Sequence, residues 1–106
     1  RYVIEGRHKS WIEQDAQSLL KENNIAWCIS DTAGKYPYLE SITADFIYMR
    51  LHGSKKLYAS NYEDDDIKLL AGKILEWSID TYVYFDNDAN GYAPLNAASL
   101  IEECRR

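Results

Sequence analysis

The sequence predicts an α/β fold in which four parallel strands alternate with helices. Short apolar runs recur along the chain, and most of them are separated by stretches with apolar residues at helical spacing. Gly, Pro and Asn residues mark the connections. Strands and helices that alternate in this way form parallel sheets with right-handed crossovers. A chain of 106 residues is long enough for one domain.

The first half of the chain is expected to hold two strands and one helix. Residues 2–5 form a short apolar strand, and residues 25–30 form the nearly continuous apolar run of a strand buried on both faces. Ser10 and Glu13 have the spacing of a capping box, which predicts a helix over residues 11–22.

The second half is expected to follow after a loop and to hold two strands and two helices. Residues 44–51 and 81–86 are the predicted strands, Ser60 or Asn61 caps the helix between them, and Pro94 lies in the first turn of the last helix. The apolar stripes of these helices are Ile67, Leu70, Ala71, Ile74 and Leu75, and then Ala97, Leu100, Ile101 and Cys104. The order β-α-β-loop-β-α-β-α fits a small open sheet or half of an eight-stranded barrel.

Composition excludes several classes of protein. A net charge of -5 argues against a nucleic-acid partner. No apolar stretch reaches the ~18 residues of a membrane span, and no signal peptide is visible. Cys28 and Cys104 are expected to pack in the core of a protein from a reducing compartment, which favours a cytoplasmic location. Because the chain starts at Arg1 inside a strand, we expect residues 1–106 to be a single partial domain.

The most informative feature is that every predicted strand ends in polar residues. Ligands of parallel α/β folds bind at the carboxyl ends of the strands, so these residues are expected to form the functional site. They are Glu5, Arg7 and His8 after the first strand, Asp31 after the second, Arg50 and His52 at the third, and Asp86, Asn87 and Asp88 after the fourth.

The types of these residues suggest roles in a site for a small anion. Arg7 and Arg50 would form a bidentate clamp for a carboxylate or phosphate. His8 and His52 have an intrinsic pKa suited to proton transfer near neutrality. The alternative is that the carboxylates and arginines form an ion-pair network that only closes one end of the sheet.

Other polar and aromatic residues complete the expected site. Glu5 and Asp31 would serve as a general base or as metal ligands, and Asn87 and Tyr58 would contact the ligand. Tyrosines within strands are instead expected in the core, namely Tyr48, Tyr82 and Tyr84.

No cofactor is required by the sequence, and a divalent metal is only weakly indicated. The chain has no H-x-x-x-H or C-x-x-C spacing. The acidic run over residues 63–66 is better explained as the first turn of a helix, where carboxylates favour the positive end of the helix dipole.

Three segments resemble a known family: EGRHKSW (5–11), TADFIYMRLHG (43–53) and YVYFDNDANGYAPLNAASL (82–100). Together they are similar to the YecE-like family of uncharacterised proteins, and the resemblance spans essentially the whole chain. It implies a TIM-type (β/α)8 barrel of which this chain supplies the C-terminal half. Two positions depart from the family pattern. Gly6 stands where a larger residue is usual, and Asp86 replaces the first Asn of Phe-Asn-Asn.

Two functions from different classes fit these observations. The first is an enzyme with a polar site at the strand ends that acts on a small anionic or phosphate-bearing substrate. The second is a non-catalytic ligand-binding or protein-interaction module that uses the same residues. A half-barrel also leaves two sheet edges open, so we expect self-association or association with the missing N-terminal half.

Overall fold

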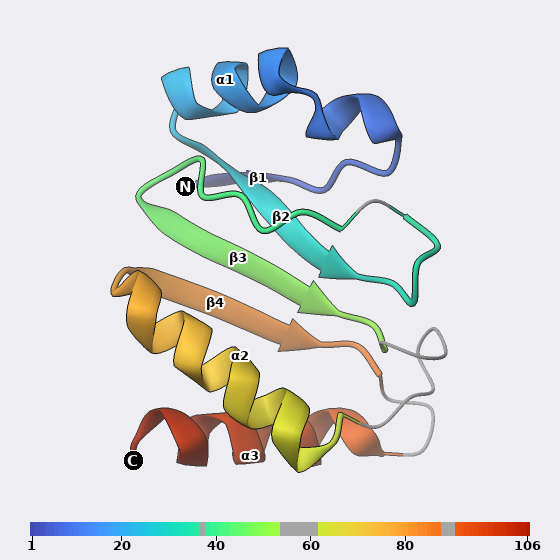
Figure 1. Ribbon diagram of the computed structural model, residues 1–106, viewed down its shortest axis with the longest axis vertical. Coiled ribbons are helices and arrows are strands. Elements are labelled where there is room, and N and C mark those ends of the chain that lie inside the picture. Colours follow the sequence, from blue (N-terminus) through green and yellow to red (C-terminus); the bar gives the residue numbers. More distant parts are fainter. Residues whose placement is uncertain (37, 54–61, 88–90) are drawn as a thin grey trace.

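The computed structural model describes residues 1–36, 38–53, 62–87 and 91–106, and it contains one parallel sheet with strand order β1-β2-β3-β4 (Figure 1). In chain order the elements are β1 (Tyr2–Ile4), the 3-10 helix η1 (Lys9–Ile12), α1 (Gln14–Glu22), β2 (Ile25–Asp31), β3 (Phe46–Leu51), α2 (Asp64–Trp77), β4 (Asp80–Phe85) and α3 (Tyr92–Cys104). Neighbouring strands pair in parallel throughout. In the described part of the chain, no helix is both long and apolar enough to cross a membrane.

The helices bury one face of the sheet in a single hydrophobic core. Trp27 and Ile29 of β2 and Met49 of β3 lie almost fully buried in this core, together with Leu20 of α1 and Ile67 of α2. Alternate residues of a strand point to opposite faces, so the apolar runs supply one side chain in two to this core. Figure 1 shows α1 beside β1 and β2, with α2 and α3 packed together beside β4.

Several predicted core residues are confirmed, and four are wrong. Cys28 is buried, and Cys104 packs against the core from α3. Leu75 and Ile101 are instead about half exposed, as are Tyr82 and Tyr84 of β4. The two helix residues lie at the edge of their stripes. Tyr84 lies on the sheet face that carries no helix.

The predicted start of the first helix is also wrong. The Ser10 hydroxyl does not cap a helix but lies 2.9 Å from Nδ1 of His8. Residues 9–12 form a 3-10 turn, and α1 begins only at Gln14, with Glu13 as a backbone cap. The contact between the Ser10 and His8 side chains therefore replaces the capping box that the spacing suggested.

In the second half, the acidic run does form the first turn of a helix, as expected. Glu63 is the N-cap of α2, and the capping box pairs its carboxylate with the backbone of Asp66 while Asp66 bonds back to the backbone of Glu63. The predicted caps Ser60 and Asn61 lie outside the described residues.

A loop rather than a helix connects β2 to β3, as the sequence predicts. The Thr43 hydroxyl accepts the backbone N–H of Trp27 at 2.8 Å and donates to the carbonyl of Ile25 at 2.6 Å. The backbone N–H of Asp45 is bound by the side chain of Asn24 at 2.9 Å. Side-chain hydrogen bonds therefore hold the chain just before β3, and β3 begins at Phe46 instead of at residue 44.

The opposite face of the sheet carries no helix, corresponds to the inner, concave face of a barrel wall, and is only partly covered. Tyr82 and Tyr84 are 41% and 48% exposed, and the Tyr84 ring packs on that of Tyr48 with centroids 5.2 Å apart. The whole chain exposes 6585 Å², whereas a folded monomer of this length exposes about 6,100 Å². The additional exposed area is consistent with this strand face and the two open edges, which a closed barrel would bury.

The Gly6 departure from the family pattern has a steric cause in this structure. A Cβ atom on Gly6 would lie 2.4 Å from Cγ of Trp11, and Trp11 packs against the core. The indole therefore occupies the space that a larger residue at position 6 would need.

We predict that Gly6→Ala lowers the free energy of unfolding by about 1–3 kcal/mol, because Trp11 must leave its position. Urea denaturation followed by tryptophan fluorescence measures the change. Gly72→Ala is the matched control. Gly72 lies in α2 with no neighbouring atom within 4 Å of its added Cβ, so this change should stabilise by about 0.5–1 kcal/mol. Equal effects of the two substitutions would contradict the steric explanation.

We also predict that the chain self-associates through its uncovered strand face and open edges. Light scattering over a range of concentrations should show species larger than a monomer, and Tyr84→Lys should reduce them. Leu19→Lys, at a side chain on α1 that is 59% exposed, should leave association unchanged. A monomer at all concentrations would contradict the prediction.

Candidate functional site

The parallel register brings polar side chains from several strands to one level of the concave face. Ser30 of β2 is the register partner of Arg50 in β3, which is in turn the partner of Tyr84 in β4. Backbone bonds extend this alignment past the strands, because the N–H of His52 donates to Asp31 and that of Asp86 donates to Leu51, each at 2.8 Å. The sequence therefore places the polar ends of β2, β3 and β4 side by side.

Arg50 is the centre of the resulting cluster. Its Nη1 donates to Oε1 of Glu5 at 2.7 Å, which links β3 to the segment after β1. Its Nε and Nη2 lie 3.0 and 2.9 Å from Oδ2 of Asp86, which links β3 to the end of β4. One guanidinium thus holds carboxylates from both sides of its own strand, and it uses the donor geometry that makes arginine suited to such pairs.

His52 lies deeper, between the same two carboxylates. Its side chain is 3% exposed, and its Nε2 and Nδ1 lie 3.6 Å from Oε2 of Glu5 and Oδ2 of Asp86 respectively. The side chains of Glu5, Asp86 and Arg50 remain 21–33% exposed. The imidazole is therefore covered, while the charged groups beside it stay open to solvent.

The charges of the cluster stabilise one another. Burial alone would raise the pKa of Glu5, but the Ser30 hydroxyl, which donates to Oε2 at 2.7 Å, and the Arg50 guanidinium lower it below its ordinary value. For Arg50, burial acts against the charge, and the bonds to Asp86 and Glu5 raise the pKa above its ordinary value. Glu5 and Arg50 are accordingly an ionised pair near neutral pH.

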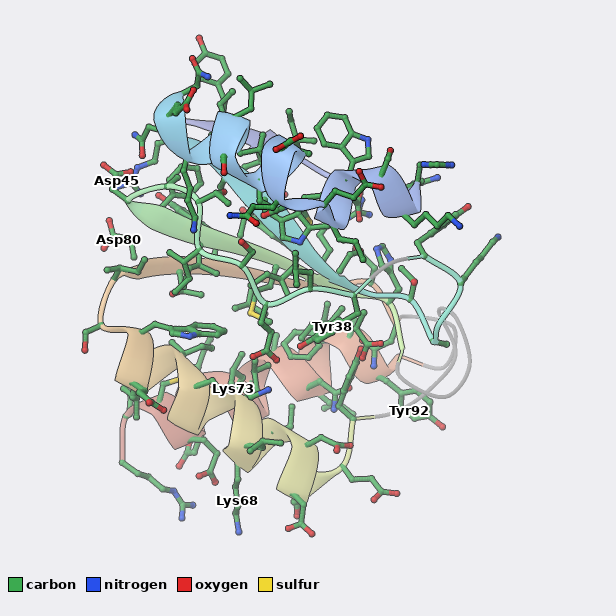
Figure 2. The ribbon with its side chains drawn as sticks, turned by 45° about the horizontal axis from the view of Figure 1, so that its top comes forward. Tyr38, Asp45, Lys68, Lys73, Asp80 and Tyr92 are labelled. Atoms are coloured by element: carbon green, nitrogen blue, oxygen red, sulfur yellow. The ribbon has the colours of Figure 1, made fainter. Side chains whose placement is uncertain are left out.

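Asp31 lies outside this cluster, on the helix-covered side of the sheet. Its Oδ2 accepts the Tyr62 hydroxyl at 2.9 Å, and the same hydroxyl accepts the backbone N–H of Gly53 at 3.0 Å. With Tyr38 of the β2–β3 loop and Lys73 of α2, Asp31 lines a separate cavity of about 280 Å³. Figure 2 shows Tyr38 and Lys73 on this side of the molecule.

Asn87 also points away from the cluster. It is fully buried, and its Nδ2 donates to Oδ1 of Asn96 in α3 at 2.7 Å. The Asn96 side chain in turn bonds both the N–H and the carbonyl of Tyr62. This network joins the end of β4 to α3 and to the segment just before α2.

The remaining predicted site residues lie at the outer rim of the cluster or outside the described residues. The Arg7 guanidinium carbon lies 4.9 Å from the centre of the Tyr36 ring, whereas the Arg50 guanidinium binds Glu5 and Asp86. The backbone N–H of Ser10 donates to Nδ1 of His8, which places the proton of a neutral His8 ring on Nε2. Tyr58 lies outside the described residues.

Two members of the cluster had not been given a role from the sequence. Ser30 is hidden in an apolar strand, although its alternation with Cys28 would have placed it on the concave face. Asp86 was expected among the polar residues after the fourth strand but was given no individual role, yet its Oδ2 accepts from two nitrogens of Arg50. The Cys28 thiol shares this face, and its burial raises its pKa to about 12, so it is not a thiolate.

The arrangement suits proton transfer and hydrogen bonding better than metal binding. Within the described ranges, no group of three or more His, Cys, Asp or Glu residues is placed to hold a metal ion. An ionised carboxylate and an imidazole 3.6 Å apart can accept and donate protons.

Four parallel strands with helices on one face and polar groups at the strand ends define half of a TIM-type barrel. The family model described as "Protein of unknown function DUF72" matches residues 1–106, so the chain belongs to this family. The half-barrel fold and the YecE-like resemblance predicted from the sequence are both confirmed. No curated protein matches the chain.

Two solved structures of DUF72 family proteins share this fold. The protein from Thermotoga maritima is 26% identical with a TM-score of 0.86, and the alignment covers 98% of this chain and 46% of that one. The protein from Enterococcus faecalis is 22% identical with a TM-score of 0.85, covering 98% and 47%. The chain therefore spans about half the length of these solved structures.

We predict that the ion pairs of Glu5 stabilise the fold in a pH-dependent way. Because the pKa of Glu5 is lowered on folding, its stabilisation is complete above the ordinary value of 4.5 and is lost as the pH falls through the lower folded value. Wild type should therefore exceed Glu5→Gln in stability at neutral pH, and the difference should shrink toward about pH 3.

Urea midpoints of both proteins across this range measure the effect. Glu22→Gln, at an exposed position on α1, is the matched control and should show no such convergence. A difference in stability between wild type and Glu5→Gln that is constant with pH would contradict the stabilising role of the ionised Glu5 carboxylate.

Proposed function

We propose that the cluster around Arg50 is the active site of an enzyme that transfers a proton to or from a small substrate carrying a carboxylate or phosphate. The observation that carries this proposal is the placement of the His52 imidazole between two carboxylates at the carboxyl ends of parallel strands. Ligand sites of barrel proteins lie at these strand ends. The parent barrel, of which this chain is about half, would carry out the reaction.

The roles within the site follow from the charges. Glu5 is held ionised and partly exposed, so it would accept a proton or a substrate hydroxyl bond. His52 would carry the proton, since an imidazole can both accept and donate one. Arg50, which already holds two carboxylates, would position Glu5 and Asp86 rather than bind the substrate itself.

A non-catalytic binding module is the second candidate, and one observation favours it. The guanidinium of Arg50 is engaged on both sides by carboxylates, as in an ion-pair network that serves structure alone. Such a module would bind a ligand near these residues without changing it.

Incubation of the parent barrel in D₂O with a panel of small phosphate monoesters and carboxylates distinguishes the two candidates. For an enzyme, we predict consumption of a compound or exchange of a carbon-bound hydrogen, detected by NMR and mass spectrometry. Glu5→Gln and His52→Gln should each lower the rate by about a hundredfold or more. Glu22→Gln should retain it. Binding without any chemical change would support the module, and the absence of both would exclude the two candidates.

A further inference from the structure

One half-buried tyrosine ring is approached by two positive charges at the rim of the site. The Arg7 guanidinium carbon lies 4.9 Å from the centre of the Tyr36 ring, and Nζ of Lys35 lies 5.4 Å from the same centre. Both cations are exposed, whereas Tyr36 is half-buried. The aromatic ring attracts each cation, and so it brings together two charges that repel one another.

The ring is held in place by the turn that follows β2. The Thr32 side chain is buried, and its hydroxyl accepts the N–H of Tyr36 at 2.9 Å. The N–H of Lys35 donates to the Thr32 carbonyl at 3.1 Å. Ala33 and Gly34 adopt positive φ angles of 54° and 82°, which complete the reversal of the chain. The turn therefore fixes the backbone from which the Tyr36 ring extends.

Neither cation is neutralised by a carboxylate within the described residues. Arg1, Arg50 and Lys73 each form an ion pair there, but Arg7 and Lys35 form none. In a chain with a net charge of -5, two adjacent cations without a carboxylate form a local positive patch. This patch is complementary to an anion.

The patch lies next to the proposed active site. Arg7 follows Glu5 by two residues after β1, and Lys35 follows the end of β2, so both belong to the carboxyl ends of neighbouring strands. An anionic group held here would leave the rest of a small molecule near Glu5.

We propose that Arg7 and Lys35, with Tyr36 as their platform, hold the anionic group of the substrate. This proposal rests on the proposed function for its substrate, and it replaces the expected clamp of Arg7 with Arg50. The site takes a phosphate monoester or a carboxylate at the rim, while Arg50 orients the carboxylates of the proton-transfer groups.

The experiment is an NMR titration of ¹⁵N-labelled protein with inorganic phosphate at constant ionic strength, with chloride as the comparison salt. Phosphate should shift the amide signals of residues 7 and 35–36, and chloride should not. Arg7→Gln and Lys35→Gln should each weaken phosphate binding by about tenfold. Tyr36→Phe should retain the affinity, since the ring face and not the hydroxyl contacts the cations.

Lys21→Gln, which removes an exposed charge on α1, is the matched control and should bind phosphate like wild type. Equal affinities of all variants, or equal shifts with chloride, would overturn the proposal. Glu5→Gln separates this proposal from the proposed function, because it should keep phosphate binding while losing proton transfer. Phosphate binding that needs Arg7 and Lys35 in a protein without activity would support the anion site and refute the enzyme.

Discussion

The arrangement of the carboxyl ends of the strands depends on the ion pairs of Arg50. Parallel strands that end at one level bring their polar residues together, and like charges gathered there would repel. Arg50 resolves this by binding Glu5 on one side and Asp86 on the other. Because these partners come from the ends of different strands, the same contacts that order a site also fix the strand ends. Structure and proposed chemistry are therefore coupled at one residue.

The sequence predicts the level of the site along the strands but not the face on which each residue lies. Glu5, Arg50 and His52 were expected together, and the structure brings them together. Asp31 and Asn87 were expected beside them only because they follow strands. Each is the sequence neighbour of a cluster member, Ser30 or Asp86, and neighbouring residues in extended chain point to opposite faces. Counting alternate residues along each strand would have placed Asp31 and Asn87 on the opposite face from the cluster.

Other differences arise from side chains that bind the backbone in place of regular structure. Ser10 contacts His8 instead of capping a helix, and Thr43, just before the predicted third strand, bonds to β2 through its side chain. Both hydroxyls have local partners that a spacing rule does not weigh. The Gly6–Trp11 contact is of the same kind, because the steric demand comes from a residue five positions away that folds back. Such contacts depend on the tertiary path of the chain.

The concave face limits what can close this sheet into a barrel. The interior of an eight-stranded barrel is just wide enough for its own side chains. Here β1 and β2 contribute small side chains such as Val3 and Cys28, whereas β3 and β4 contribute Tyr48 and Tyr84. Two copies related by a twofold axis along the barrel would set β3 and β4 opposite their own equivalents. Tyrosine layers would then meet tyrosine layers, which overfills the interior. A closed barrel therefore calls for an unlike half with small residues facing the tyrosines, and copies of this chain that associate through the uncovered face and open edges would not complete one.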